Sequence, residues 1–431
     1  MKTVGEVKIK LDFVFSLVVF MMLFASMTLM RLRLANDGYY HFGGAELAIA
    51  PIDLVVFVAL FSYLLFGKLK VSFLNYLDWL AVLYVFLMFF SILSTSDLNY
   101  TMYEIVRQIK YFFVYLIIKA FFVRKCGFLW MVVFIVLVQF FVSLVQVEVG
   151  VTISGDGSET ELNLISGGVV RAVGTLGHPG VLAQYINIIS MFLFSALVFL
   201  RVKKVWVLSA FLLSLYILVV TYSRTAMVVE FVLCLVMAVF SIYSGWNKFG
   251  VKNVFLGLSF LSLVFLYCVL NYDALYERFF LSENESGEIR LVLMDIAFEM
   301  IKESPFLGVG LNAFTEVMSL YDKTMISSYW PMPVHNIYLL VASELGVLGL
   351  ITFILVITSF IFSGLRIICS LGDRYVVWLA AASVWGLFAI LFYGLLGWSW
   401  RLDSIQFLFW LCLAGVSASF DTWATQSVER D

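Results

Sequence analysis

The chain has 431 residues, of which 63% are hydrophobic and only 13% charged, and its mean hydropathy is +1.02. This composition excludes an ordinary soluble domain, in which about half of the residues are apolar. The formal net charge of −2 carries little information, and we expect no nucleic-acid partner. The apolar residues come in blocks of about twenty, the length of a helix that crosses a bilayer. We therefore predict an all-α, polytopic membrane protein.

The apolar blocks predict about twelve transmembrane helices. Alternate connections between them, such as GKLK and RVKK, are short and basic, which places these connections and both termini in the cytoplasm. The first block is long and no A-x-A cleavage site follows it, so we expect it to remain as a helix. In chain order the predicted helices span about 11–30, 47–66, 77–94, 105–123, 127–147, 180–200, 205–223, 226–243, 254–270, 337–364, 376–396 and 405–420.

Two of the predicted outer loops are long, at 148–178 and 271–336. The second contains GEIRLVLMDIAFEMIKESP, in which the apolar residues Ile289, Val292, Ile296 and Met300 share one helical face. We interpret this stretch as an amphipathic helix that lies on the membrane surface and ends at Pro305. The expected organisation is N-terminal helices at 1–147, a core with both long loops at 148–364, and C-terminal helices with a short tail at 365–431.

Arginine is frequent on the predicted outer face, whereas the inner connections are rich in lysine. A guanidinium group binds phosphate or carboxylate in a bidentate manner. Arg224 lies in TYSRTA, a tight turn with no other charge, and Arg290 begins the amphipathic helix. Snorkelling of Arg224 and solvation of Arg290 are the simpler alternatives, but the set as a whole favours anion binding. The outer arginines are Arg31, Arg33, Arg107, Arg171, Arg224, Arg278, Arg290 and Arg401.

His335 stands in PVHNIYLLVASELGVLGL, at the start of a predicted helix and just behind two prolines. The partial positive charge of a helix N-terminus disfavours imidazolium, so this histidine is expected to be neutral and able to accept a proton. A histidine that only caps the loop is the alternative. The apolar run is longer than a bilayer requires, which predicts that the helix projects outward or breaks near ELGVLG. Glu344 would then lie near the interface.

His178 stands in GTLGHPGVLAQY, before another predicted helix. Pro179 suits a first helical turn, and glycines before a helix can cradle a phosphate, although such turns are common before membrane helices. Asp53, Arg107 and Lys110 lie in the outer halves of their helices, which indicates a polar cavity open to the outer leaflet. The histidines and the five cysteines have no metal-ligand spacing, so we expect neither a metal nor a cofactor.

The order RAVGTLGHPGVLAQY, TYSRTA, RLVLMDIAFEMIKESPFLGVGLNAF and VHNIYLLVASELGVLGL resembles the O-antigen ligase and O-antigen polymerase superfamily over about 170–355. This resemblance implies a bacterial inner-membrane glycosyltransferase of the GT-C type. Its donor would be a glycan on undecaprenyl pyrophosphate in the outer leaflet, and arginines would neutralise the leaving group without a metal. The motifs match Arg224 and Arg290 to the family's arginines and His335 to its loop histidine. Gly180 stands where the family more often has asparagine.

We therefore expect His335, Arg224 and Arg290 to be catalytic. A repeat-unit polymerase is favoured because two long outer loops could hold two glycan chains. The alternatives are a ligase that transfers the glycan to lipid A–core or a protein, and a transporter or flippase of lipid-linked sugars. The lack of sequence repeats weakens the transporter hypothesis. The residues expected to bind substrate are Arg171, His178, Asn336, Glu344 and Arg401.

Overall fold

A computed structural model describes residues 16–28, 32–33, 48–66, 74–123, 127–150, 164–165, 169–200, 204–244, 285–328, 330–370 and 372–428. Within them the fold is helical, apart from two pairs of two-residue antiparallel strands, β1 (Leu32–Arg33) with β2 (Ala48–Ile49) and β3 (Leu164–Ile165) with β4 (Val169–Val170). The prediction of an all-α fold is confirmed.

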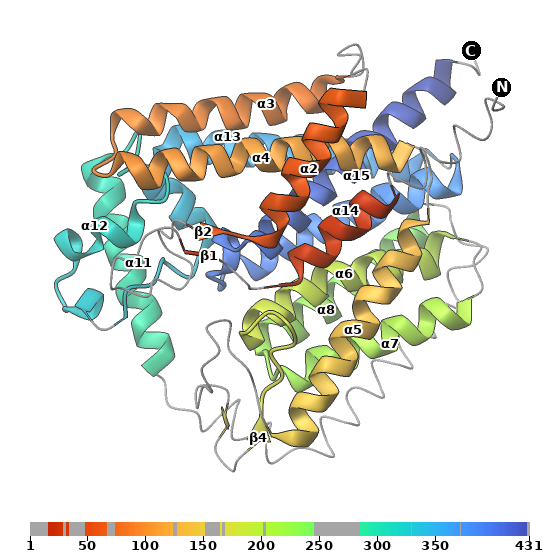
Figure 1. Ribbon diagram of the computed structural model, residues 1–431, viewed down its shortest axis with the longest axis horizontal. Helices are drawn as coiled ribbons and strands as arrows, with labels where there is room; N and C mark the ends of the chain where they lie inside the picture. Colours follow the sequence, from red (N-terminus) through yellow and green to blue (C-terminus); the bar gives the residue numbers. More distant parts are fainter. Residues whose placement is uncertain are drawn as a thin grey trace.

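The helices follow the predicted order (Figure 1). The first described helix covers Ser16–Ser26. It is followed by α2 (Pro51–Phe66), α3 (Tyr76–Met88), η2 (Phe89–Leu93), α4 (Leu98–Val123), α5 (Phe128–Val149), α6 (Pro179–Phe199), α7 (Lys204–Val220), α8 (Arg224–Tyr243), α11 (Glu285–Glu303), α12 (Phe314–Tyr321), η5 (Ile326–Ser328), α13 (Ile337–Cys369), α14 (Arg374–Tyr393), η6 (Ser399–Arg401) and α15 (Asp403–Val428).

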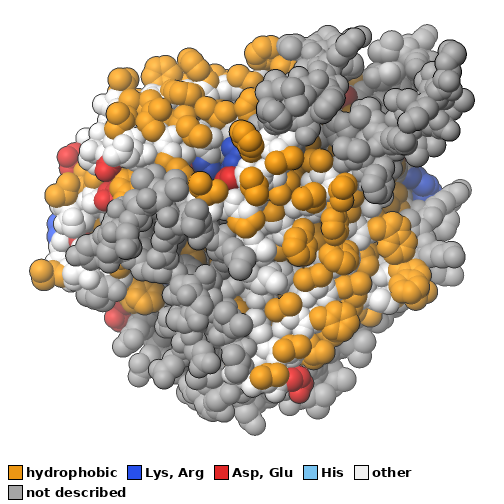
Figure 2. Space-filling view, viewed as in Figure 1, with side chains coloured by type: hydrophobic (Ala, Val, Ile, Leu, Met, Phe, Trp, Pro, Cys, Tyr) orange, Lys and Arg blue, Asp and Glu red, His pale blue; other side chains and the backbone are white. Residues whose placement is uncertain are grey.

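Seven of the described helices are long and apolar enough to cross a membrane, so the protein is a membrane protein. Every predicted helix that falls on described residues coincides with a helix, whereas the one expected at 254–270 lies outside them. The total of twelve crossings stays a prediction. Figure 2 shows hydrophobic side chains over α3 and α5 on the visible face. On α5 the exposed side chains include Trp130, Phe141 and Val145, as expected of a surface that contacts lipid.

The core is built around α6, which packs against α5, α7, α8, α14 and α15 and is buried along its whole length. Indole N–H groups at this core have backbone partners: Trp378 donates to the carbonyl of Phe192 at 3.1 Å, and Trp385 donates to that of Leu233 at 3.2 Å. Such partners are needed because a buried donor without one is costly in an apolar medium.

Helix α13 is broken at Gly346, whose φ of 67° and ψ of −173° are not helical. Of the two outcomes expected for this helix, an outward projection or a break near ELGVLG, the break is confirmed. The gap in the helix is filled by residues 305–310, here called the wedge, which follow α11. Three backbone hydrogen bonds join the two segments: Val309 N–H to Ser343 O at 2.9 Å, Gly310 N–H to Glu344 O at 3.1 Å, and Val347 N–H to Pro305 O at 2.8 Å. The wedge thus satisfies backbone groups that the break leaves free.

The predicted amphipathic stretch forms α11, and its buried face packs against α13. Ile296 and Met300 are buried as expected, Ile289 and Val292 are partly buried, and exposed residues include Glu288 and Asp295. Whether α11 lies on the membrane surface stays a prediction. Helix α4 begins at Leu98, whereas the predicted helix begins near residue 105. The first two turns of α4 are too polar to form part of an apolar block.

Candidate functional site

Three helices, α6, α8 and α13, begin at one place in the fold. Residues at the end of α14 contact the start of each of these helices. The Tyr393 hydroxyl donates to the carbonyl of Gly180 in the first turn of α6 at 2.8 Å, and it also bonds the side chain of Ser223, the N-cap of α8. The N–H of Ile337, the first residue of α13, donates to the carbonyl of Gly394 at 2.8 Å. Each helix N-terminus carries partial positive charge, so their convergence favours an anion.

Arginine side chains add full charges at these helix N-termini. Arg224 is the first residue of α8, and Arg171 donates through Nε to the carbonyl of Thr221 at 3.0 Å, in the turn before α8. Arg290 comes from α11. Burial lowers the pKa of Arg290 and the charge of Arg224 lowers it further, whereas Tyr393 acts in the opposite direction. Like charges repel, so an arrangement that brings Arg224 and Arg290 together suits an anionic ligand between them.

His335 lies directly before α13, where its Nδ1 is 3.2 Å from the carbonyl oxygen of Pro333. A carbonyl oxygen only accepts, so Nδ1 carries the hydrogen of this bond and Nε2 has a free lone pair. Burial, and then the positive charge of Arg290, lower the pKa of His335 to about 4, although the Pro333 carbonyl opposes the shift. At neutral pH the imidazole is uncharged and Nε2 can accept a proton.

His178 is the N-cap of α6 and has the other tautomer. Its Nδ1 accepts the N–H of Gly180 at 3.0 Å, so Nε2 carries the hydrogen and is a donor. Its ring meets Trp398 edge to face, with centroids 5.3 Å apart. Burial, followed by the charges of Arg171 and His335, lowers the pKa of His178 to about 3. The His178, Arg171, Arg224, Arg290 and His335 side chains together are here called the cationic site.

A comparison with protein families matches residues 208–354 to the family described as O-antigen ligase. This segment, about a third of the chain, is similar to the O-antigen ligase family. The match supports a membrane glycosyltransferase of the O-antigen ligase and polymerase type. A search of curated proteins finds no match. The matched segment runs from α7 into α13, so it contains Arg224, Arg290 and His335, the three residues predicted to be catalytic.

The cationic site also draws on residues outside the O-antigen ligase segment. Arg171 and His178 precede it, whereas Tyr393 and Trp398 follow it. Sequence reasoning selected the first two and missed the last two, because a tyrosine and a tryptophan near the end of an apolar helix are ordinary in a membrane protein. Only the packing of α14 against α6 brings them to the site.

The glycine-containing turn before His178 is engaged by α5 rather than open to a ligand. Gln146 accepts the N–H groups of Val173 and Gly174 at 3.0 and 2.8 Å, and Gln139 accepts that of Thr175 at 3.1 Å. These three amides already have protein partners, so they give no support to a phosphate cradle in GTLGHPG. A Cβ at Gly180 would lie 3.2 Å from both the His178 ring and the Tyr393 hydroxyl, so the glycine fits a crowded position.

Asn336 caps the first turn of α13. Its Oδ1 accepts the N–H groups of Tyr338 and Leu339 at 2.9 and 3.0 Å, and its Nδ2 donates to the carbonyl of Leu395 at 3.2 Å. The side chain thus fixes where α13 starts and how it meets the α14–η6 connection. This engagement accounts for the asparagine beside His335 without a substrate contact.

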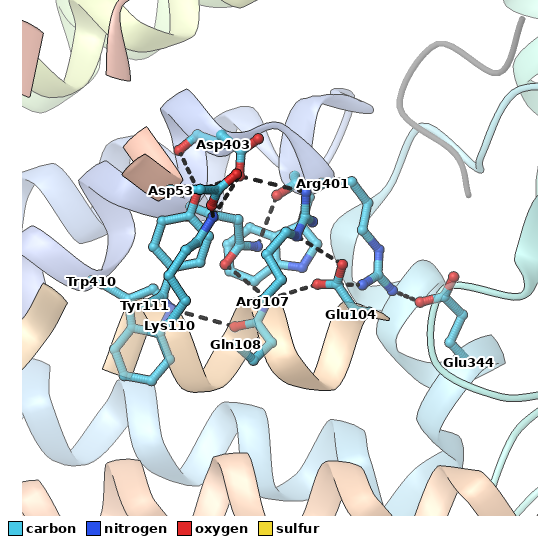
Figure 3. A network of polar contacts seen from close by, with 12 residues as sticks. Asp53, Glu104, Arg107, Gln108, Lys110, Tyr111, Glu344, Arg401, Asp403 and Trp410 are labelled. Carbon is cyan, nitrogen blue, oxygen red and sulfur yellow. Dashed lines mark hydrogen bonds and ion pairs between the residues drawn. The ribbon is translucent and has the colours of Figure 1, made fainter. Parts of the chain in front are cut away.

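Glu344 and Arg401, two further residues expected to bind substrate, form an ion pair with each other inside the protein (Figure 3). They are 2% and 5% exposed. The pair ends a run of alternating charges, here called the ion-pair chain, in which Arg401 also contacts Glu104 at 3.1 Å. The remaining contacts are Glu104–Arg107 at 2.8 Å, Arg107–Asp403 at 3.7 Å, Asp403–Lys110 at 3.4 Å and Lys110–Asp53 at 2.6 Å.

The ion-pair chain joins α2, α4, α13, η6 and α15 (Figure 3). Its acids Glu104 and Asp403 were not singled out from the sequence. The signal that could have found Glu104 is its i,i+3 spacing to Arg107 on one helix. Within the described residues, no three His, Cys, Asp or Glu side chains are grouped to hold a metal ion. Independence from metal stays a prediction.

Proposed function

We propose that the protein transfers a preassembled glycan from undecaprenyl pyrophosphate to a hydroxyl group of an acceptor sugar. The reaction would take place on the outer face of the bacterial inner membrane, in the assembly of a surface polysaccharide such as O-antigen or exopolysaccharide. The observation that carries the proposal is His335 at the start of α13, beside half-buried arginines and three converging helix N-termini. The O-antigen ligase match of the segment with His335, Arg224 and Arg290 supports it.

The cationic site suits the pyrophosphate of the donor. Arg224 and Arg290 would hold the phosphate oxygens through their planar forks. Arg171 and the Nε2–H of His178 would supply further donors. As the bond to the sugar breaks, negative charge grows on the leaving pyrophosphate, and fixed guanidinium groups in a site of low dielectric stabilise that charge. These groups would serve without a bound metal.

His335 would act as the general base. Its Nε2 takes the proton of the acceptor hydroxyl as that oxygen attacks the anomeric carbon of the donor glycan. The bond between the anomeric carbon and the phosphate oxygen breaks, and undecaprenyl pyrophosphate leaves with the electron pair. The low pKa of His335 belongs to the protein without substrate. Bound pyrophosphate would raise it toward neutrality, because a nearby negative charge favours imidazolium.

The acceptor decides between a polymerase and a ligase. Two long predicted outer loops, at 148–178 and 271–336, favour a repeat-unit polymerase that holds two glycan chains. The match to the O-antigen ligase family favours a ligase, which would transfer the glycan to lipid A–core or to a protein. A flippase has less support, since the cationic site gathers at helix N-termini on one side of the fold rather than along a path through it.

The test is a reconstitution of the purified protein with lipid-linked repeat units alone, then with lipid A–core added. A ladder of products from repeat units alone identifies a polymerase, whereas a product that requires lipid A–core identifies a ligase. Both reactions should persist after EDTA treatment. His335→Gln in the same vesicles is the control for contaminating activity. Absence of any glycan transfer, with lipid-linked sugar moving across the bilayer instead, would refute the proposal in favour of a flippase.

A further inference from the structure

The wedge meets α13 backbone to backbone, with no room for side chains at the contact. A Cβ at Gly346 would lie 2.2 Å from the carbonyl carbon of Phe306, and a Cβ at Gly308 would lie 2.4 Å from that of Glu344. Both glycines have positive φ, 67° and 71°. Only glycine combines this conformation with so close an approach. These close contacts therefore allow the wedge only one position in the break of α13, here called the seat.

The α3–α4 connection holds the wedge from its other side. Ser94 donates to the carbonyl of Leu307 at 3.4 Å, and Thr101 of α4 donates to the carbonyl of Leu311, the residue after the wedge, at 2.8 Å. A Cβ at Gly310 would lie 2.6 Å from Thr95. Because the wedge directly follows α11, these contacts fix the end of the helix that carries Arg290. The break that receives the wedge lies in α13, which begins two residues after His335.

The ion-pair chain ends at this break. Glu344 lies two residues before Gly346, and besides Arg401 it accepts the N–H of Phe314 at the start of α12 through Oε1 at 3.4 Å. Arg401 connects Glu344 with Glu104 of α4. Arg401 also closes η6, and Trp398, just before η6, packs on His178. One guanidinium group thus links the α13 break with the turn that supports His178.

We propose that Glu344 and Arg401 are positioning residues, which act with the wedge to set where Arg290 stands relative to His335. They touch no substrate. Their ion pair fixes the conformation of α13 at the break. The break binds the wedge through backbone hydrogen bonds, and the wedge fixes the position of the end of α11. The effect on turnover rests on the proposed function, because it requires Arg290 and His335 to act on one donor. The geometric part of the proposal is that the seat fixes the position of α11 relative to the start of α13. This part does not depend on the proposed function.

A distance measurement tests the geometric part. Spin labels at two exposed positions, Leu291 on α11 and Leu396 after α14, would report the separation by pulsed electron paramagnetic resonance in a background free of the native cysteines. Glu344→Gln keeps the shape but loses the charge pair, and Gly346→Ala blocks the seat. Gly287→Ala on α11 is the matched control, since a Cβ there meets nothing within 4 Å.

We expect Glu344→Gln and Gly346→Ala to shift or broaden the distance distribution, and Gly287→Ala to leave it unchanged. Unchanged distributions in both folded variants would overturn the proposal. If Gly346→Ala does not fold, Glu344→Gln alone decides. Turnover should fall about 10- to 100-fold in Glu344→Gln, because a misplacement of about 1 Å can cost about 10²-fold.

The pH profile separates positioning from simple loss of folded protein. If Arg290 moves away from His335, the acid limb of kcat/KM should move to higher pH, since the charge that opposes imidazolium is further away. A smaller amount of active protein would lower the rate at every pH without moving the limb, and that result would overturn the proposal. If the wild-type protein transfers no glycan, the proposed function fails, while the distance measurement still decides whether the seat positions α11.

Discussion

His178 and His335 belong to one cationic site but have opposite tautomers. His178 accepts the Gly180 N–H through Nδ1 and keeps its hydrogen on Nε2, whereas His335 donates from Nδ1 to Pro333 and keeps a lone pair on Nε2. A backbone group fixes each tautomer, and burial keeps each ring neutral. The first histidine is therefore suited to donate to a phosphate oxygen, and the second to accept the proton of a hydroxyl group.

The role of His335 predicts equal losses in two different variants. Both His335→Ala and His335→Gln should lower turnover at saturating donor by about 10²–10⁴-fold, the range for a lost general base. Glutamine keeps hydrogen bonding but cannot take the proton. A purely capping role predicts the reverse, with an active glutamine variant and an unstable alanine variant. Glutamine turnover above about a third of wild type would exclude the catalytic role.

The role of His178 predicts a different pattern. His178→Asn retains a side-chain acceptor for the Gly180 N–H, because asparagine is a preferred N-cap, but it loses the Nε2–H donor. We expect KM for the lipid-linked donor to rise about tenfold with a smaller change in kcat, since a hydrogen bond to a charged group contributes about 1.5–3 kcal/mol. A loss confined to kcat would show that His178 takes part in the chemical step instead.

The pKa of His335 predicts an unusually low acid limb. An exposed histidine titrates near pH 6.5, but burial and Arg290 lower the pKa of His335 to about 4 in the free protein. Protonation removes the base, so kcat/KM should stay level from pH 7 to about 5 and fall as the pH approaches 4. The acid limb of kcat should lie at higher pH than that of kcat/KM, because bound pyrophosphate stabilises imidazolium. A limb of kcat/KM near pH 6.5 would contradict this environment.

The arginines are predicted to need their planar fork. Arg224→Lys and Arg290→Lys should each lose most transfer activity, because an ammonium group keeps the charge but not the bidentate geometry. Arg366→Lys is the matched control, since Arg366 lies in the last turn of α13, stacks on Trp423 and has no place in the cationic site. Activities of both site variants near wild type in a radiolabelled-donor assay would rule out bidentate binding of pyrophosphate.

The proposed topology predicts sided labelling. Ser328→Cys, at the exposed last residue of η5, should react with an impermeant maleimide in intact spheroplasts. The native Cys369, at the end of α13 and exposed, should react only after lysis, and it serves as the internal control when the other cysteines are replaced. The opposite labelling pattern would show that the protein has the inverse orientation in the membrane, with the cationic site on the cytoplasmic side.

Apolar blocks and turn chemistry were enough to predict most of the fold. They located the described long apolar helices, though not the short α12, and the excess length of the apolar run predicted that α13 either projects outward or breaks near ELGVLG, where Gly346 breaks it. Hydropathy could not find the start of α4, because it detects the length within the bilayer rather than the length of the helix. Residues 98–104 are helical yet too polar to be counted.

The candidate site was predictable only in part. Arg224 and His335 stand out as charged or titratable groups at the ends of apolar helices, and Arg290 stands out as a charge near the start of an amphipathic helix. Tertiary packing supplies the rest. The sequence marks Arg401 and Glu344 as charges near the outer face, but their mutual pairing requires η6, directly before α15, to lie beside α13, which no local pattern specifies. A charge that is already neutralised looks the same in the sequence as one that awaits a ligand.

The complete burial of α6 affects how the chain is made. A nascent membrane protein releases its helices to lipid one after another, and α6 appears long before α14, against which it packs. Until α14 and η6 arrive, Gln184 lacks the Ser399 hydroxyl that it later binds, and α6 faces lipid on sides that are covered in the finished protein. Ribosomes that stop before α14 would leave an exposed, partly polar helix in the bilayer, a form that membrane quality-control proteases can recognise.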